Sequence, residues 1–248
     1  MTTGKELLTI LSDELKDLGL HDMAESLDIM YHSPDFLMMD HLSLLEKMIS
    51  AEYEAKISKR INNRLKNAHL NGCPQEINQC RDSQNREYIP TGIIPALSSL
   101  DFIQAGQNVC ILGPSDSGKS YLAKAIGIKA CTNYRVGYYH CETFLEDMVA
   151  LKQRDYQKYI RKIKSHVRLD LLILDDFLLH TITDEREIKV LFDIMEKRSE
   201  ASVSTIVCSQ REPKSWKSMI LNDEVSANSI MKRATKHYTV IINSKGTD

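Results

Sequence analysis

Features common to secreted and membrane proteins are missing from this 248-residue sequence. No apolar run approaches the roughly 20 residues that a membrane-spanning helix needs, and the first residues lack the apolar core of a signal peptide. The six cysteines are scattered and form no C-x-x-C pair of the kind that holds zinc. We therefore expect a protein of the reducing cytoplasm with no membrane partner.

A strong net charge is also missing, since the formal charge at pH 7 is −2. This near-neutral sum neither indicates nor excludes nucleic acid, because the distribution of cations matters more than their total. The hydrophobic share of 42% and the charged share of 27% are typical of a globular protein. The length suits one large domain, or a core with a small appendage.

Residues 1–70 are predicted to form a small all-helical domain. Apolar residues recur there every three or four positions, which is the spacing of an amphipathic helix. Three helices are expected: one ending at Gly19, a short one over 23–31, and a long one over 42–65. The stripe that defines the first helix consists of Leu7, Leu8, Leu11, Leu15 and Leu18.

Residues 71–95 differ in character from the segments on either side. Gly72, Pro74, Pro90 and Pro95 interrupt a stretch rich in Gln and Asn. We expect a linker or a loosely packed connection here.

Residues 96–248 alternate between strand-like apolar runs and helical segments. This alternation indicates an α/β fold with a parallel sheet flanked by helices. Only five residues follow the last expected strand, so no C-terminal helical lid is predicted. The expected strands are 108–112, 135–140, 169–174, 204–208 and 238–243.

Residues 113–120 read Gly-Pro-Ser-Asp-Ser-Gly-Lys-Ser and match every fixed position of the phosphate-binding loop G-x-x-x-x-G-K-[ST]. An apolar run precedes the octapeptide and a helical pattern follows it, which is the context that the motif requires. The alternative is an ordinary strand-to-helix turn with a surface lysine. We predict that the loop binds a nucleoside triphosphate through Gly113, Pro114, Ser115, Asp116, Ser117, Gly118, Lys119, Ser120 and Tyr121.

The chemistry of phosphate explains the residue types in this loop. Gly113 and Gly118 allow the backbone N–H groups to turn inward around a phosphate, and the following helix begins with unsatisfied N–H groups. Lys119 is expected to reach the β- and γ-phosphates, and the Ser120 hydroxyl to ligate Mg²⁺.

Residues 171–176 form an apolar run that ends in two acids, Asp175 and Asp176. Ligands of open α/β sheets bind at the carboxyl ends of the strands. We expect Asp175 to hold Mg²⁺ through water and Asp176 to orient the attacking water. A strand that simply enters a loop is the alternative.

Gln210 follows another apolar run, 204–208, and is a candidate to sense the γ-phosphate or to hold the hydrolytic water. A plain turn at the strand end is the alternative.

Two segments concentrate positive charge. No acid lies between Glu54 and Glu76, and residues 152–168 carry seven cations against Asp155 alone, with Tyr156 and Tyr159 among them. Cations interspersed with aromatic residues suit a surface that follows a DNA backbone; a solvated helical face is the common alternative. The candidate DNA-binding residues are Lys56, Lys59, Arg60, Arg64, Lys158, Arg161, Lys162 and Lys164.

Together these motifs resemble the IstB-like group of AAA+ ATPases, the ATP-binding helper proteins of insertion-sequence transposases, which are related to DnaC-type helicase loaders. The resemblance extends over nearly the whole chain. Besides the phosphate-binding loop and the run ending in Asp176, it rests on residues 60–68, Leu191-Phe192, Lys197-Arg198, Ser209-Gln210, Trp216 and the Ala227-x-x-Ile230-x-x-Arg233 segment.

The resemblance implies an ATPase that uses ATP and Mg²⁺, binds double-stranded DNA, forms a homo-oligomer and assists a transposase. It implies DNA or partner binding by the helical domain, and a DNA-facing helix between the second and third core strands. It also implies that Arg233 acts in the ATP site of a neighbouring subunit. A surface salt bridge of Arg233 with Asp223 or Glu224 is the alternative.

The chain departs from the family pattern at several positions. Asp176 and Gln210 stand where Glu and Asn are usual, Lys232-Arg233-Ala234 replaces Asp-Arg-Leu, and the chain ends at Gly246-Thr247-Asp248 where relatives continue into Ser-Tyr-Arg. We expect these departures to affect the rate of hydrolysis, which we predict to be slow and stimulated by DNA, more than nucleotide binding.

Three other functions compete with a transposase helper. A helicase loader would have the same fold and grip a replicative helicase. A metabolic P-loop kinase would leave the basic segments without a role. A nucleotide-regulated binding module with little hydrolysis is compatible with Asp176.

Overall fold

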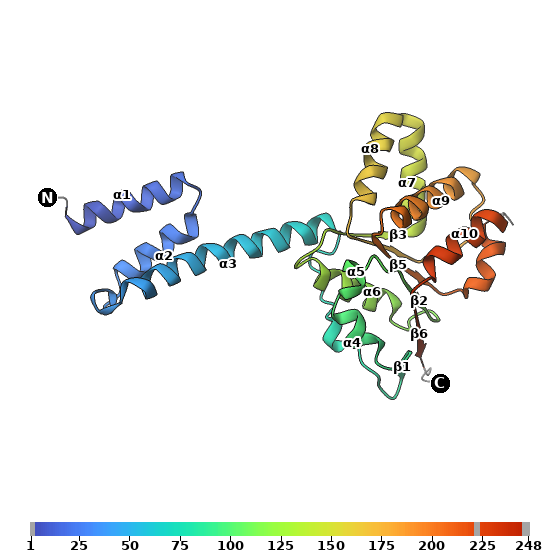
Figure 1. Cartoon of the computed structure of the whole chain (residues 1–248), viewed down its shortest axis with the longest axis horizontal. Helices are drawn as coiled ribbons and strands as arrows, with labels where there is room; N and C mark the ends of the chain where they lie inside the picture. Colours follow the sequence, from blue (N-terminus) through green and yellow to red (C-terminus); the bar gives the residue numbers. More distant parts are fainter. Residues whose placement is uncertain (1–2, 221–223, 245–248) are drawn as a thin grey trace. The chain divides into compact units, whose positions relative to one another are not determined.

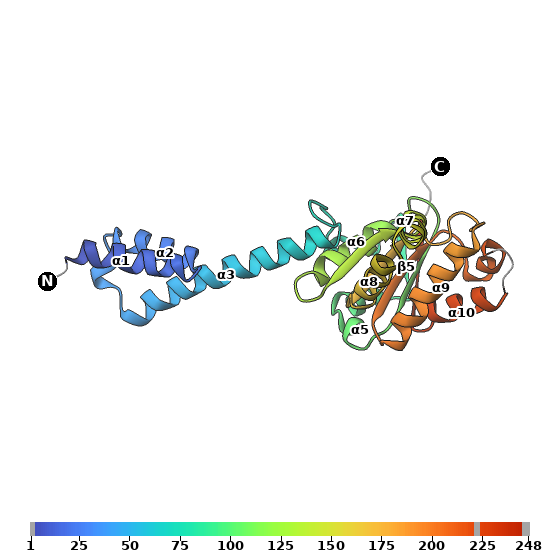
Figure 2. The same ribbon diagram turned by 90° about the horizontal axis from the view of Figure 1, so that it is seen from above.

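A computed structural model describes residues 3–220 and 224–244 of the chain (Figures 1 and 2). The chain divides into two compact units, residues 1–63 and 64–248. Each unit is described by itself below.

The first unit is helical, as the sequence predicts. It contains α1 (Gly4–Asp17), α2 (His21–Tyr31), a short 3₁₀ helix η1 (Phe36–Met38) and most of α3 (His41–Asn67). The α1 helix begins with a capping box, in which the Thr3 hydroxyl accepts from the backbone N–H of Glu6. The buried apolar residues of this unit are few: Leu8, Ala24, Leu27, Met30 and Met48.

The expected apolar stripe of the first helix is only partly buried. Leu8 is 8% exposed, whereas Leu7 and Leu11 are 50% and 41% exposed. Leu18 is 74% exposed and serves as the C-cap of α1. The helical spacing of apolar residues therefore predicted the helix correctly. It did not predict how many residues of the apolar stripe are buried within the unit.

The boundary between the units falls before the predicted position at residue 70. Ala68 and Leu70 are buried in the core of the second unit, and the Ala68 carbonyl accepts a hydrogen bond from the backbone N–H of Tyr138 at 3.0 Å. Leu65, in the last turn of α3, is partly buried against the same core, so this turn belongs to the second unit.

The second unit is built on a six-stranded sheet with the order β1-β6-β2-β5-β4-β3. The five strands predicted from the sequence are confirmed to within two residues at each end, and all five are parallel. The sixth, β1, pairs antiparallel with β6 at one edge. The strands are β1 (Arg86–Ile89), β2 (Val109–Leu112), β3 (Val136–His140), β4 (Leu171–Asp175), β5 (Ser204–Ser209) and β6 (Tyr238–Ser244).

Helices cover both faces of this sheet (Figures 1 and 2). One face packs against α4 (Ile93–Ser98), α5 (Asp101–Gln104) and α6 (Lys119–Ala130). The other face packs against α7 (Cys141–Arg154), α8 (Tyr156–Val167), α9 (Glu185–Glu200) and α10 (Glu224–Ala234), with a 3₁₀ helix η3 over Pro213–Met219.

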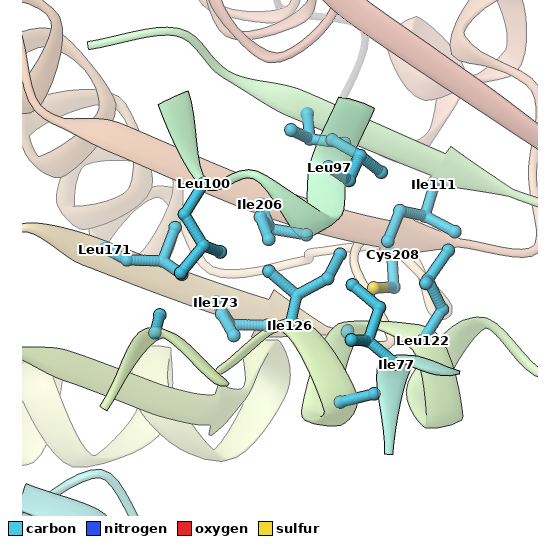
Figure 3. Packing of buried hydrophobic residues seen from close by; sticks show 14 of the residues in the cluster. Ile77, Leu97, Leu100, Ile111, Leu122, Ile126, Leu171, Ile173, Ile206 and Cys208 are labelled. Carbon is cyan, nitrogen blue, oxygen red and sulfur yellow. The ribbon is translucent and has the colours of Figure 1, made fainter. Parts of the chain in front are cut away.

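Alternation along the strands divides the core into two clusters. Ile111 and Ile173 point toward α6, and the neighbouring Cys110 and Leu172 point to the opposite face. Figure 3 shows the first cluster, with Leu122 of α6 close to the strand residues. Because both faces are covered, the central strands are apolar throughout, which explains why continuous apolar runs identified them.

Residues 71–95 are not the loosely packed linker that the sequence predicts. They contain a 3₁₀ helix, η2 (Ile77–Gln79), the strand β1 and the start of α4. Ile77, Cys80, Tyr88 and Ile93 are at most 6% exposed. These few apolar residues are spread among polar ones, so the composition concealed their common position in the core.

Within the described residues, no helix combines the length and the apolar character needed to cross a membrane.

Candidate nucleotide-binding site

The phosphate-binding loop connects the central strand β2 to the helix α6, and its two glycines have different reasons to be there. A Cβ at Gly113 would lie 2.6 Å from the Ile242 carbonyl oxygen and 2.7 Å from the Ser117 hydroxyl oxygen, so the loop has no room for a side chain. Gly118 has a φ of 101°, a left-handed conformation that side chains rarely adopt. The loop conformation thus depends on both.

Two polar side chains of the loop are buried. Ser117 is fully buried and its hydroxyl has no hydrogen-bond partner among the described residues. Lys119 is 5% exposed, and its ammonium donates to the Pro114 carbonyl of the same loop at 2.6 Å. Burial lowers the pKa of Lys119, and the nearby Asp175 and Asp176 partly oppose that shift. A buried hydrogen-bond donor without a partner costs free energy. The oxygens of a bound phosphate would accept hydrogen bonds from the donors of this loop.

Arg86 also lies against this loop, and sequence analysis missed it. A Cβ at Gly118 would lie 3.0 Å from the Arg86 guanidinium carbon, and the buried Arg86 Nε has no hydrogen-bond partner. Arg86 is in β1, inside the segment expected to be a linker. The short run Arg86-Glu87-Tyr88-Ile89, which contains two good strand formers, was the only signal available for it.

The two acids lie at the carboxyl end of β4, as predicted, and each has a partner from the neighbouring strand β3. Asp175 is fully buried and accepts a hydrogen bond from the Tyr138 hydroxyl at 2.5 Å. Burial, followed by this hydrogen bond, raises the pKa of Tyr138, so that the hydroxyl remains a donor. Asp176 is half-buried, has a φ of 53°, and its carboxylate lies 3.1 Å from His140 Nδ1.

The two acids differ in how accessible their carboxylates are. Asp175 keeps one buried carboxylate in a fixed orientation near the loop. The Asp176 side chain is 36% exposed, so its carboxylate is the more accessible of the two. Tyr138 and His140 were not predicted, because the pairing of β3 with β4 cannot be read from the sequence.

The donor set fits Mg²⁺ bound together with phosphate. Mg²⁺ is usually held by one or two carboxylates with the substrate's phosphates and waters, and not by a cage of protein ligands. The half-buried Ser120 hydroxyl has no hydrogen-bond partner among the described residues, and Asp175 supplies a carboxylate. Within the described part of the chain, no group of three or more His, Cys, Asp or Glu residues is arranged so that it could hold a metal ion.

Gln210 follows the last residue of β5, Ser209, at the same edge of the sheet. The Ser209 carbonyl accepts from the Gly113 N–H at 3.3 Å, so Gln210 comes directly after a contact with the loop. Its side chain is exposed. Tyr121 lies one residue beyond Ser120, and its hydroxyl donates to Gln79 at 2.6 Å.

Arg233 lies near the end of α10, where it is held by its own chain. Its guanidinium forms an ion pair with Glu196 at 3.1 Å and lies 5.6 Å from the centre of the Phe192 ring. Arg233 therefore does form an ion pair, but its partner Glu196 is neither of the acids named in the predicted alternative. Of the two acids named for it, Asp223 lies outside the described residues and Glu224 pairs with Lys217.

The candidate DNA-binding residues are divided between the two units. Lys56, Lys59 and Arg60 are exposed on α3 within the first unit, and Lys56 pairs with Glu52 at 3.2 Å. Arg64 donates to the carbonyl oxygens of Cys131 and Thr132, at the end of α6, which gives it a structural role.

The other four candidates lie on α8 in the second unit. This helix buries Tyr159, Ile163 and His166 and leaves its cations exposed. Among the described residues, none of Lys158, Arg161, Lys162 and Lys164 takes part in an ion pair.

A phosphate-binding loop after the central strand of a parallel sheet, with two acids at the end of another strand, defines a P-loop nucleotide-binding protein. Residues 13–247 match the family described as IstB-like ATP binding protein. The chain belongs to this family, as the resemblance implied.

The relatives include proteins of bacterial insertion sequences. A Sinorhizobium fredii protein, described as an insertion sequence ATP-binding protein, is 32% identical over 222 residues, covering 88% of this chain and 86% of that protein. The corresponding protein of insertion sequence IS232 from Bacillus thuringiensis is 28% identical, with 93% and 90% covered.

Solved structures share this fold. The replication initiator DnaA bound to AMPPCP and single-stranded DNA aligns with 70% of this chain at a TM-score of 0.56 and 20% identity, and this chain spans half of the DnaA chain. DnaI aligns with a TM-score of 0.54 and 18% identity over 71% of this chain and 91% of its own.

Proposed function

We propose that this protein is an ATP-dependent DNA-binding ATPase that assists a transposase in DNA transposition. The observation that carries the proposal is the nucleotide site of a family member: a buried Lys119 and an unpartnered Ser117 hydroxyl in the loop, with Asp175 and Asp176 at the end of β4. Relatives that are described as ATP-binding proteins of insertion sequences support the connection with transposition.

In the proposed reaction the loop and α6 bind the phosphates of ATP. Lys119 would donate to the β- and γ-phosphates, and Ser120 and Asp175 would hold Mg²⁺, which would neutralise charge on the phosphates. Asp176 orients the attacking water, Gln210 contacts the γ-phosphate or that water, and Arg233 acts from a neighbouring subunit.

Asp176 has one methylene less than the Glu usual in AAA+ proteins, and we expect this difference to slow hydrolysis. A displacement of about 1 Å can cost on the order of 100-fold in rate. Asp176→Glu should therefore raise the turnover number, and Asp176→Asn should remove most of the remaining activity while ATP binding is retained. Steady-state phosphate release and ATP binding, measured on both variants, check this. Normal hydrolysis by the Asn variant would assign the role to another residue.

We propose that duplex DNA binds along the exposed cations of α8 and of α3, through its phosphates and with little sequence preference. The exposure of the α8 cations supports this, as does the absence of any ion pair to them among the described residues. DnaA, which shares the fold, is seen with single-stranded DNA.

The salt dependence of DNA binding tests this surface. If about six phosphates are contacted, log K should fall against log salt concentration with a slope near −5. Replacing Arg161, Lys162 and Lys164 by alanine should flatten the slope and weaken binding to all sequences alike. The matched control replaces Lys214, Lys217 and Lys232, which lie outside α8 and α3. Equal slopes of log K against log salt concentration for the two triple variants would mean that the α8 cations are an ordinary solvated face and do not contact DNA.

A helicase loader in DNA replication is the alternative function. The likeness to DnaI is one of fold, so it does not favour this alternative over a transposase helper. Pull-down with the purified transposase of the same insertion sequence and with a replicative helicase distinguishes the two.

The six free cysteines, five of them buried, fit a reducing cytoplasm.

A further inference from the structure

A cavity of about 540 Å³ lies beside β3, the edge strand of the sheet, and no step of the proposed reaction uses it. Residues of β3, α6, α7 and α8 line it, together with His69 after α3. All of these belong to the second unit. Its volume is within the range of about 300–1,000 Å³ typical of ligand pockets.

Aromatic rings form one side of the cavity. The ring centre of Tyr139 lies 5.3 Å from that of Phe144 and 5.2 Å from that of His166, and Phe144 and His166 are 5.1 Å apart. The exposed His69 meets Tyr139 edge to face at 5.1 Å. Of these three packed rings, the half-buried Tyr139 has the most accessible surface, since Phe144 and His166 are 4% and 2% exposed. A planar ligand in the cavity would therefore stack on Tyr139.

His166 gives this side a polar group that the protein leaves unused. It is 2% exposed and lines the cavity, yet no hydrogen-bond partner for its ring nitrogens exists among the described residues. Burial, followed by the nearby Lys162 and Arg198, lowers the pKa of His166 to about 4. At neutral pH the ring is therefore uncharged and presents one donor and one acceptor.

Two lysines from different helices line the cavity as well. Lys124 of α6 lies 5.1 Å from the centre of the Tyr138 ring, and Lys162 of α8 is exposed. Among the described residues neither takes part in an ion pair. Asp147 is the one acid in the lining, so the cavity favours an anionic ligand.

We propose that this cavity binds one unpaired nucleotide of a DNA strand, with the base against Tyr139 and the phosphate near Lys124 and Lys162. The inference rests on the proposed DNA binding and adds a site for a base to it. The features of the cavity match the chemistry of a nucleotide. The Tyr139 ring suits the planar base, the unused His166 nitrogens suit its polar atoms, and the two lysines suit the phosphate. If an aromatic side chain of a protein partner occupied the cavity instead, the two lysines would have no negative charge beside them.

The cavity also shares residues with the nucleotide site. Tyr138 and His140 line it, and the same two residues contact Asp175 and Asp176. Occupancy of the cavity and the position of the two acids are therefore physically linked.

The test compares two strands of equal length and charge, an oligothymidylate and a strand of abasic units. Stacking of one base contributes about 1–3 kcal/mol, so the full chain should bind the oligothymidylate about 5-fold to 150-fold more tightly. Thr143→Trp, at an exposed position in the lining, should fill the cavity and bring this affinity ratio close to one. Gln153→Trp, exposed on the same helix outside the lining, is the matched control and should keep the ratio.

Two further measurements locate the base. His166→Phe keeps the ring and removes the polar nitrogens, and should lower the ratio by about 3-fold or more. A strand that contains 5-iodouracil should photocrosslink to the peptide that includes Tyr139 and Phe144 in the parent protein. The same crosslink should be absent from the Thr143→Trp variant.

A ratio near one in the parent, or equal ratios in the two Trp variants, would overturn the cavity site. If duplex binding with the expected salt slope persists in that case, the proposed DNA binding stands without the cavity. If the parent binds neither single strands nor duplex, both proposals fail.

Discussion

Replacing Lys119 by alanine is expected to weaken ATP binding by about 100-fold. The buried ammonium has the Pro114 carbonyl as its hydrogen-bond acceptor, and phosphate would replace that acceptor with a charged one. Loss of a charge-assisted hydrogen bond costs up to about 3 kcal/mol, which corresponds to this change in affinity.

Thermal unfolding with ATP and Mg²⁺ measures the effect, because a ligand that binds only the folded state stabilises it. The parent should gain several degrees and Lys119→Ala little or nothing. Lys129→Ala, at the other end of α6, is the control and should respond as the parent does. Equal shifts of the unfolding temperature in the parent and in Lys119→Ala would mean that Lys119 does not bind ATP.

The second large effect is expected at Arg233, if the protein works as an oligomer. An arginine that reaches the γ-phosphate from a neighbouring subunit can contribute about 10³–10⁵ in rate. Arg233→Ala should then hydrolyse ATP at a small fraction of the parental rate, whereas Lys232→Ala, its exposed neighbour, should remain active.

The ion pair with Glu196 makes a subunit-mixing experiment necessary. Arg233→Ala and Lys119→Ala should each be inactive alone. Mixed oligomers should recover activity, because some sites then combine an intact loop with an intact arginine. No recovery in proteins that demonstrably co-assemble would leave Arg233 with its structural role beside Phe192 and Glu196 alone.

The parts of the site that the sequence predicted are those that a local pattern encodes. The loop of residues 113–120 and the run ending in Asp176 each fix a backbone shape and a chemical group within a few residues. Their common position at one edge of the sheet followed from the parallel topology.

The parts that were missed depend on pairings between distant segments. Tyr138 and His140 reach the two acids because β3 lies next to β4, and the strand order of a sheet is set by the whole fold. Arg86 reaches the loop from a polar-rich segment whose few apolar residues gave no period. The cavity beside β3 arises where four elements meet, so no single stretch of sequence could indicate it.

The proposed function makes one combined claim, that ATP hydrolysis and DNA binding are linked in this chain. The most direct test is the steady-state rate of ATP hydrolysis, measured in the parent while duplex DNA is added, with Lys119→Ala as the background. We predict a slow basal rate that rises several-fold as DNA saturates, and no DNA-dependent hydrolysis in the variant. A parental rate that is the same with and without DNA, at concentrations where DNA is shown to be bound, would contradict the account.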